Sequence, residues 1–377
     1  MSARKGAPLV LIAAGGTGGH LFPAEALAAE LKARGIEVEL ATDKRAATFA
    51  GSFPARKIHV LPADTVRSRN PLSLVLTATR LGFGTLKAIW LLLRARPVAV
   101  VGFGGYPTVP PVLAAWIVRV PRIVHEQNAV MGRANRLLAR LASAIATGYP
   151  RIFSDAPRLA AKAVHVGNPV RAAVREAAAR AYETPEAGPI RLLVFGGSQG
   201  ARIMSEVVPA AIERLPVALR SRIEVVQQAR AEDLAEARAT YARLGVKAEL
   251  AAFFGDLPAK MAQAHLVIAR SGASTVAELA ATGRPAVLVP LAHAIDQDQL
   301  ANASALAAAG GALLIRQPDF TAERLSGELA RLLSDPGRLF AMAAAAKAAG
   351  RADAAERLAD EAMRVAGLAQ MREKTRA

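Results

Sequence analysis

At 377 residues the chain is too long for one ordinary domain, and its 53% hydrophobic composition excludes a disordered chain. The absence of cysteine excludes a disulfide framework and thiolate metal sites, and six scattered histidines predict no zinc site. The net charge of +17 indicates an anionic partner, although a generally basic proteome would produce the same charge. Only 5% of the residues are aromatic, without interleaved basic residues, so we expect no nucleic-acid partner.

The first predicted strand, residues 8–14, runs directly into the glycine-rich stretch AAGGTGGHLF (13–22), and a helix is expected over 21–31. A glycine turn between a strand and a helix presents backbone N–H groups and the positive end of the helix dipole. This environment suits an anion, most often a phosphate. The spacing fits neither the dinucleotide-binding fingerprint nor the P-loop, so the ligand stays open.

Residues 71–93 form an apolar stretch interrupted by basic residues that recur every seven positions on one helical face: Arg80, Lys87 and Arg94. Interior charges argue against a membrane span, and the pattern is typical of an interfacial amphipathic helix. Arg67 and Arg69, just before it, are placed to meet anionic headgroups. We expect one side of this helix to face the core and one to face lipid. An ordinary crossover helix is the alternative.

Other predicted strands also end in polar groups. One ends in Gly104-Gly105-Tyr106, a second in His125-Glu126-Gln127-Asn128, and a third in the loop Arg270–Ser274 before a helix. Each has an ordinary structural alternative: a core histidine at 125, turn or cap asparagines at 128 and 302, and a capping box formed by Thr275 and Glu278. Asp296-Gln297-Asp298 matches a short metal motif, but it lies at a predicted helix start, and we assign no metal there.

A second glycine turn repeats the pattern of the first. Residues 192–201, LLVFGGSQGA, again give a strand, two glycines, a hydroxyl residue, another glycine and a helix from about Arg202. Between the halves, residues 182–190 are rich in Pro, Gly and Glu and are typical of a linker. Alternating strands and helices predict parallel sheets, whose ligands bind at the carboxyl ends of the strands. We therefore expect two similar α/β halves with phosphate-binding turns across one cleft.

A series of motifs then stands in order along the chain: GGTGGH (15–20), GFGGYPTVPP (102–111), HEQN (125–128), GNPVR (167–171), GGSQGA (196–201), RSGASTVAELAATGRPAVLVP (270–290) and DQLANA (298–303). Together, from about residue 9 to 350, they closely resemble the MurG family of bacterial cell-wall N-acetylglucosaminyltransferases. The resemblance implies a GT-B fold of class α/β: two Rossmann-like domains with parallel sheets facing a cleft. It places the acceptor- and membrane-binding domain at 1–168, a linker at 169–190 and the donor domain at 191–349, with a helix of about 350–377 returning to the first domain.

The resemblance also implies site residues. Arg171 and Ser198 match donor positions suited to diphosphate, Glu278 matches the carboxylate that takes the ribose hydroxyls, and Gln299 matches a contact to the sugar or diphosphate. Phe254 aligns where the family often has isoleucine, whose backbone reads the uracil. Tyr106 is assigned to the acceptor side. The full donor set for UDP-N-acetylglucosamine (UDP-GlcNAc) is Thr17, Gly18, Gly19, Asn128, Arg171, Ser198, Phe254, Ala273, Ser274, Thr275, Glu278 and Gln299.

The family activity is inverting transfer from UDP-GlcNAc to the C4 hydroxyl of undecaprenyl-pyrophosphoryl-MurNAc-pentapeptide (lipid I), giving lipid II. Glycine-turn amides, Arg171 and a helix dipole can stabilise the departing diphosphate, so neither metal nor cofactor is expected. His20 is the first candidate base and Glu126 the second. A structural imidazole closing the turn is the alternative for His20.

As partners, the resemblance implies lipid I, an anionic membrane surface contacted through residues 67–94, and cell-wall and division proteins. It implies a peripheral protein at the cytoplasmic face of the inner membrane. Two alternatives stay open: another GT-B enzyme, such as a glycolipid glycosyltransferase or a UDP-sugar 2-epimerase, and a catalytically silent membrane scaffold. HEQN and GGYPTVPP disfavour the former; Arg171, Glu278 and Gln299 disfavour the latter.

Overall fold

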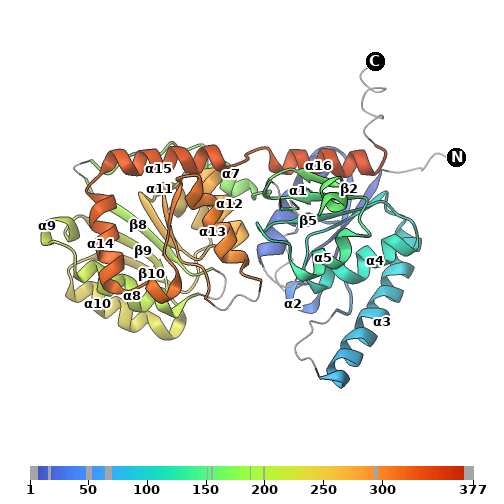
Figure 1. The fold of residues 1–377 in the computed structure, drawn as a ribbon, viewed down its shortest axis with the longest axis horizontal. Coiled ribbons are helices and arrows are strands. Elements are labelled where there is room, and N and C mark those ends of the chain that lie inside the picture. Colours follow the sequence, from blue (N-terminus) through green and yellow to red (C-terminus); the bar gives the residue numbers. More distant parts are fainter. Residues whose placement is uncertain are drawn as a thin grey trace, which may run out of the picture. The chain divides into compact units, whose positions relative to one another are not determined.

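The structure, a computed structural model, describes residues 7–15, 18–47, 53–63, 70–150, 152–153, 156–186, 188–197, 200–292 and 296–368. The chain divides into two compact units. The first contains the residues up to Arg171 and those from Asp353 onward, and the second contains Ala172–Ala352. Each unit is built on one parallel β-sheet with helices packed on its faces (Figure 1).

The sheet of the first unit has the strand order β3-β2-β1-β4-β5-β6-β7. Its strands are β1 (Leu9–Ala13), β2 (Glu37–Thr42), β3 (Lys57–Val60), β4 (Ala99–Gly102), β5 (Arg122–Glu126), β6 (Ala144–Thr147) and β7 (Ala163–His165). Every residue of β1 is apolar and buried, as a parallel strand covered on both faces requires. Ala13 lies in register with Ala41 and Gly102, so β1, β2 and β4 end close together at one edge.

Two layers of helices cover this sheet. Leu27 of α1 and Leu358 of α16 share one buried cluster, and Leu92 of α3, Val112 of α4 and Leu138 of α5 share another. The helices of the unit are α1 (Gly18–Ala33), α2 (Lys44–Ala47), α3 (Pro71–Ala95), α4 (Val109–Ile117), α5 (Arg133–Ala139), α6 (Pro157–Ala160) and α16 (Ala354–Val365), with the short 3₁₀ helix η2 (Tyr106–Thr108) before α4. None of the described helices, the 25-residue α3 included, is both long and apolar enough to cross a membrane.

The sheet of the second unit has the order β10-β9-β8-β11-β12-β13. Its strands are β8 (Ile190–Phe195), β9 (Ile223–Gln228), β10 (Lys247–Ala251), β11 (Leu266–Ala269), β12 (Ala286–Leu288) and β13 (Ala312–Leu314). Its helices are α7 (Ala172–Ala177), α8 (Arg202–Glu213), α9 (Val217–Arg220), α10 (Leu234–Arg243), α11 (Leu257–Gln263), α12 (Ala273–Thr282), α13 (Asp298–Ala308), α14 (Ala322–Leu333) and α15 (Pro336–Ala349), with 3₁₀ turns η3 (Ala231–Asp233) and η4 (Gln317–Asp319).

In both sheets the chain fills one side of a central strand before it crosses to the other side. The switch falls between β1 and β4 in the first unit and between β8 and β11 in the second. Ligands of open α/β sheets bind outside the carboxyl ends of the strands at such a switch. Both glycine turns follow a switch strand, β1 or β8, so the topology places each turn at the edge where a ligand is expected.

The segment 169–190, predicted to be a linker, is partly structured. It contains the six-residue α7, whose Val174 is buried and which packs against α11 and α12. Lys347 Nζ donates to the Ala178 carbonyl oxygen at 3.1 Å, and Arg284 donates to the Arg180 carbonyl oxygen at 3.0 Å. Cations favour the carbonyl oxygens at the end of a helix. Because both cations come from the second unit, the segment from Ala172 onward belongs to that unit. A short helix with a single buried anchor left little signal in the sequence.

The helix expected at about 350–377 is found as α16 in the first unit, and it follows α15 of the second unit. Between them, a Cβ on Gly350 would lie 2.7 Å from the Ala280 carbonyl oxygen, so the chain passes too close to α12 for a side chain. α16 packs on α1, where Arg34 donates to Asp360 Oδ1 at 2.5 Å and to the Glu356 carbonyl oxygen at 3.1 Å.

Candidate functional site

The first glycine turn lies at the carboxyl edge of the first sheet. Gly15 is enclosed, because a Cβ there would lie 2.9 Å from Asp43 Oδ1 and 3.0 Å from Pro107 Cβ. The turn therefore packs against the segments that follow β2 and β4. Gly18 and Gly19 are the first residues of α1, so the positive end of that helix lies at this edge. Thr17, also predicted here, falls outside the described residues.

His20 stands in the first turn of α1, beside the turn that follows β4. A Cβ on Gly105 would lie 3.6 Å from His20 Cε1 and 3.7 Å from Nδ1, so the half-buried imidazole faces this glycine. Gly104 and Gly105 have φ values of 84° and 72°, which only glycine adopts without strain. Tyr106 follows directly in η2 and is half-buried. The structure thus brings the predicted base next to the turn that carries the predicted acceptor-side tyrosine.

His125 is a core residue that fixes the loops beside this edge. Its Nε2 donates to the Gly167 carbonyl oxygen at 3.0 Å, and its Nδ1 accepts from Gln127 Nε2 at 3.1 Å. Gln127 also donates to the Phe103 carbonyl oxygen at 2.9 Å, and Asn168 donates to the Gln127 carbonyl oxygen at 2.7 Å. Burial lowers the pKa of His125 to about 4, so the ring is neutral at pH 7. Of the two roles considered for His125, the structure supports the structural one.

Glu126, the second candidate base, is 1% exposed and accepts hydrogen bonds on both carboxyl oxygens. Oε1 accepts from Asn128 N at 3.0 Å and Asn128 Nδ2 at 3.1 Å. Oε2 accepts from Gly132 N and Asn135 Nδ2, each at 2.9 Å. Burial raises the pKa of the carboxyl group, and these hydrogen bonds oppose that rise. A carboxylate committed to its own loop is placed to orient Asn128, not to take a proton from a substrate.

Arg171 lies beside the same helix that carries His20. Its guanidinium carbon is 3.8 Å from the ring centroid of Phe22 in α1. A Cβ on Gly18 would lie 3.0 Å from that ring, so Phe22 is next to both the glycine turn and the cation. By its contacts Arg171 belongs to the first unit, at its boundary with the second. The predicted diphosphate contact therefore lies near the first anion-binding turn.

The second glycine turn follows β8 and is closed by its own backbone. A Cβ on Gly196 would lie 2.3 Å from Ala201 N, and Gly197 has a φ of 87°. Gly196 N donates to Gln228 Oε1 at 3.3 Å, so the end of β9 supports the turn. Ser198, the predicted diphosphate contact of this turn, falls outside the described residues.

Hydrogen bonds join the loops that follow β11 and β12 to the start of α13. Ser271 Oγ donates to the Gln299 carbonyl oxygen at 2.8 Å, and Asn302 Nδ2 donates to the Ser271 carbonyl oxygen at 3.2 Å. Leu291 N donates to Gln299 Oε1 at 3.0 Å. This last bond fixes which end of the Gln299 amide faces the backbone. The backbone after β12 therefore orients the side chain of Gln299, the predicted sugar or diphosphate contact.

The remaining donor-site residues stand on α12. The helix begins at Ala273, and its N-cap is Gly272, which has no side chain to form a capping hydrogen bond. The capping box predicted from Thr275 and Glu278 is wrong, because Thr275 is already the third residue of the helix. Ser274 and the buried Glu278 are four residues apart and share a helical face. A glycine N-cap at the positive end of α12 is compatible with an anion there.

Phe254 lies in the loop after β10, beneath a lysine. Lys260 Nζ is 5.0 Å from the ring centroid of Phe254, and it pairs with Glu249 at 2.8 Å and Asp256 at 3.5 Å. These contacts tie β10 to α11 across the loop. The loop predicted to read the uracil is therefore braced from both ends.

Two residues of the first unit, Asn135 and Phe22, were missed in the sequence analysis. Asn135 is 2% exposed in α5 and also donates to the His125 carbonyl oxygen at 3.0 Å. Phe22 read as an ordinary apolar residue of α1. An asparagine inside a short helical segment is the one sequence signal that points to Asn135, and no spacing pattern points to Phe22.

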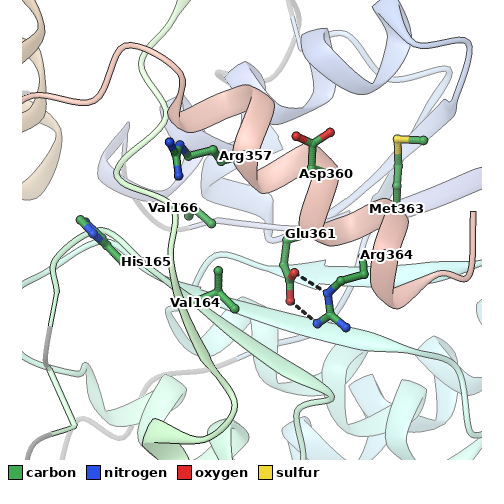
Figure 2. A pocket seen from close by; sticks show the side chains of 8 residues that line it. All are labelled: Val164, His165, Val166, Arg357, Asp360, Glu361, Met363 and Arg364. Carbon is green, nitrogen blue, oxygen red and sulfur yellow. Dashed lines mark hydrogen bonds and ion pairs between the residues drawn. The ribbon is translucent and has the colours of Figure 1, made fainter. Parts of the chain in front are cut away.

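The first unit also contains a cavity of about 470 Å³ between β7 and α16 (Figure 2). Val164, Val166 and Met363 line its apolar part. Arg364 forms a two-pronged ion pair with Glu361, at 2.6 and 2.7 Å, across its polar part. None of the predicted site residues lines this cavity. Within the described ranges, no group of three or more His, Asp or Glu side chains is gathered for a metal ion.

Comparisons with known proteins match both units. The glycosyltransferase family 28 N-terminal domain matches residues 10–147, and the glycosyltransferase family 28 C-terminal domain matches residues 191–358. The chain is 57% identical, over 366 residues, to the UDP-N-acetylglucosamine--N-acetylmuramyl-(pentapeptide) pyrophosphoryl-undecaprenol N-acetylglucosamine transferase of Rhodopseudomonas palustris strain BisB18, covering 97% of this chain and 98% of that protein. The protein of the same name from Bradyrhizobium sp. strain BTAi1 is 59% identical over 363 residues, covering 96% and 99%.

Solved structures show the same architecture. MurG of Acinetobacter baumannii matches with a TM-score of 0.77 and 28% identity, covering 95% of this chain and 99% of that chain. The UDP-GlcNAc 2-epimerase of Neisseria meningitidis matches with a TM-score of 0.67 at 14% identity, covering 95% and 100%, and shares the fold.

Two parallel α/β units, each with a glycine turn at its switch strand, define a glycosyltransferase of the GT-B fold, and the predicted fold class is confirmed. Identity above half the residues over nearly the whole chain narrows this class to one kind of transferase. The chain belongs to the MurG family.

Proposed function

We propose that this protein transfers N-acetylglucosamine from UDP-GlcNAc to the C4 hydroxyl of lipid I, giving lipid II with inversion at the sugar. The observation that carries the proposal is the pair of closed glycine turns, each at the switch strand of a unit that matches its half of glycosyltransferase family 28. The names of the relatives from R. palustris and Bradyrhizobium support this choice of donor and acceptor.

On the donor side, Arg171, Ser198 and the start of α12 are assigned to the diphosphate. An arginine and a helix start both favour the negative charge that UDP gains as it leaves. Glu278 accepts hydrogen bonds from the two ribose hydroxyls, and Gln299 and Asn128 contact the sugar. In this scheme the protein stabilises the leaving group without a metal ion or cofactor.

On the acceptor side, His20 takes the proton of the C4 hydroxyl. The bond from that oxygen to the sugar C1 forms on one face while the C1–oxygen bond to UDP breaks on the other, which inverts the configuration. Histidine suits this step because its ordinary pKa lies near neutral pH. Its place against Gly105 and next to Tyr106 puts it beside the turn assigned to the acceptor.

Attachment to an anionic membrane surface is a second part of the proposal, and α3 supports it. Ala88, Leu91 and Leu92 pack in the core, whereas the opposite side exposes apolar and basic residues: Leu76, Phe83, Leu86, Trp90 and Leu93 at 53–65% exposure, with Arg80, Lys87 and Arg94. Lys87 Nζ lies 4.8 Å from the Phe83 ring centroid, and the Arg94 guanidinium 5.5 Å from that of Trp90. Each basic residue near such a surface contributes about 1 kcal/mol.

Arg67 and Arg69, also assigned to lipid headgroups, fall outside the described residues. In the proposed arrangement the protein is peripheral, at the cytoplasmic face of the inner membrane. The cell-wall and division proteins suggested as partners rest on the family resemblance alone.

The test is UDP release by the purified protein from UDP-GlcNAc and a short-chain lipid I analogue. Reactions with UDP-N-acetylgalactosamine, and without acceptor, are the controls. We expect acceptor-dependent release with UDP-GlcNAc only. A folded protein that binds UDP-GlcNAc and releases no UDP would contradict the transferase proposal and favour a silent scaffold.

A further inference from the structure

We propose that Phe22 is a positioning residue, which holds the Arg171 guanidinium beside the first glycine turn for the diphosphate of the sugar donor. The inference rests on the proposed function, because that function assigns Arg171 to the diphosphate. Phe22 acts through Arg171 and takes no part in the reaction itself.

Arg171 needs an anchor because of where it stands. It lies in the irregular segment between β7, which ends at His165, and α7, which begins at Ala172. It is also the last residue of the first unit. A long arginine side chain loses much rotamer freedom when a ligand fixes it, and this loss weakens binding. A contact that fixes the side chain beforehand removes part of that cost.

The Phe22 ring provides such a contact without competing for the anion. At 3.8 Å from the ring centroid, the guanidinium carbon is in van der Waals contact with the ring face, which carries negative potential. The N–H donors of a guanidinium lie in its own plane, so an aromatic face holds the group by its flat side. A carboxylate in the same place would take those donors and neutralise the charge. The contact with the Phe22 ring itself uses none of these donors.

The position of the Phe22 ring is fixed by α1. Phe22 comes four residues after Gly18, so the two share one face of α1. A Cβ at Gly18 would lie 3.0 Å from Phe22 Cε2 and 3.1 Å from Cζ, which means that the glycine leaves room for the ring. Because α1 and the turn are built together, the ring and the cation it carries keep a fixed place relative to the turn.

A carboxyl group adds a longer-range attraction on the same helix. Glu25 is half-buried one turn after Phe22. Burial raises the pKa of its carboxyl, and the positive charge of Arg171 lowers it. The Glu25 carboxylate and the Arg171 guanidinium therefore attract each other, in addition to the contact between Arg171 and Phe22.

The test compares binding of UDP with binding of uridine, measured by calorimetry, because the difference isolates the diphosphate. The variants are Phe22→Leu, which removes the aromatic face, and Phe22→Tyr, the matched control that keeps it. We expect Phe22→Leu to weaken UDP binding about three- to tenfold and to leave uridine binding unchanged. Phe22→Tyr should retain the UDP affinity of the unsubstituted protein. In an Arg171→Gln background, Phe22→Leu should have no further effect.

Several results would overturn the inference. These are UDP binding that ignores Phe22→Leu or Arg171→Gln, an equal loss of uridine binding, or the same Phe22→Leu effect with and without Arg171. If Phe22→Leu fails to fold by circular dichroism, Phe22→Met replaces it as the aliphatic variant. UDP binding weakened by Arg171→Gln and not by either aliphatic variant contradicts this inference alone. An unsubstituted protein that binds no UDP contradicts the proposed function, and the inference with it.

Discussion

The two glycine turns follow the same kind of strand but are enclosed in different ways. Side chains of Asp43 and Pro107 surround the turn after β1, whereas the turn after β8 is closed by its own backbone at Ala201. The first leads into a helix that carries His20 and faces Arg171. The same strand–glycine turn–helix pattern therefore occurs in two different environments, and the neighbouring side chains determine what each turn can bind.

The difference extends to the groups at each edge. In the first unit, two ionisable side chains lie beside the turn, His20 against Gly105 and Arg171 against Phe22. In the second unit, neutral hydrogen bonds of Ser271, Gln299 and Asn302 join the loops, and the buried Arg270 guanidinium donates to backbone carbonyl oxygens. We infer that proton transfer belongs to the first unit and donor recognition mainly to the second.

The largest expected effect tests this division directly. His20→Ala should lower kcat about 10²- to 10⁴-fold, because it removes the proposed general base, with UDP binding unchanged. Gln299→Ala, in the second unit, should instead raise the KM for UDP-GlcNAc with a smaller effect on kcat. Steady-state kinetics with varied donor measure both. A His20→Ala protein with near-normal kcat would remove His20 from the mechanism and the division with it.

Alanine substitutions in the two glycine turns test how tightly each turn is enclosed, through their cost in the free energy of unfolding. Gly196→Ala should destabilise the protein by about 3 kcal/mol, because its Cβ would meet backbone at 2.3 Å, and backbone cannot move aside. Gly15→Ala should cost less, about 1–2 kcal/mol, because the Asp43 carboxylate can rotate away and the Pro107 ring, 3.0 Å from the new Cβ, has to shift only slightly.

Urea unfolding followed by far-UV circular dichroism measures both costs. Gly188→Ala is the control, because nothing lies within 4 Å of its Cβ. Equal costs at Gly15 and Gly196 would show that the two turns are enclosed alike.

The sequence predicted much of this arrangement, because strand–turn–helix order depends on local residues. β1, the first glycine turn and α1 follow from a buried apolar run, glycines and a helical pattern. The sequence does not show how each polar side chain is held by its neighbours. Glu126 read as a candidate base, but Gly132 and Asn135, six and nine residues away, occupy its Oε2. No pattern in the sequence shows which partner a carboxylate finds after folding.

The boundary between the units was harder to predict for the same reason. α7 read as linker because its six residues carry one buried anchor, and its other partners come from Arg284 and Lys347, far along the chain. Phe22 was overlooked because its partner is Arg171, which follows β7 and lies far along the chain. Local patterns therefore predict which elements form, and long-range contacts determine which side chains they hold.

Acid stability offers a further comparison, because each unit buries a histidine whose pKa burial lowers to about 4, His125 in the first and His265 in the second. As the pH falls, such a histidine is protonated in the unfolded chain before it is protonated in the folded one. Its contribution to the free energy of unfolding is therefore complete above about pH 6.5 and is lost as the pH falls toward 4. For the fully buried His125 this loss is at most about 3 kcal/mol. Glu126, with a raised pKa, acts in the opposite direction.

His125→Gln keeps a donor and an acceptor and cannot titrate, so it should flatten the pH dependence of the first unit. Tryptophan fluorescence during urea unfolding isolates this unit, because Trp90 and Trp116 are both in it. His265→Gln is the matched control and should leave the tryptophan-reported pH dependence unchanged. An identical pH dependence in His125→Gln and the unsubstituted protein would mean that His125 does not titrate in this window.

The last comparison concerns the exposed side of α3, which we propose as a membrane-binding surface of the first unit. Trp90 on α3 is 64% exposed next to Arg94, and Phe340 on α15 of the second unit is 57% exposed. If α3 meets lipid, Trp90→Ala should weaken binding to vesicles rich in anionic phospholipid about tenfold, because burial of a large apolar side chain in the interface is lost. Phe340→Ala should leave vesicle binding unchanged, and added salt should weaken it in every variant. Sedimentation with vesicles measures all three. Equal losses for the two variants would mean that exposed aromatics of either unit contact lipid and that α3 is not a dedicated membrane surface.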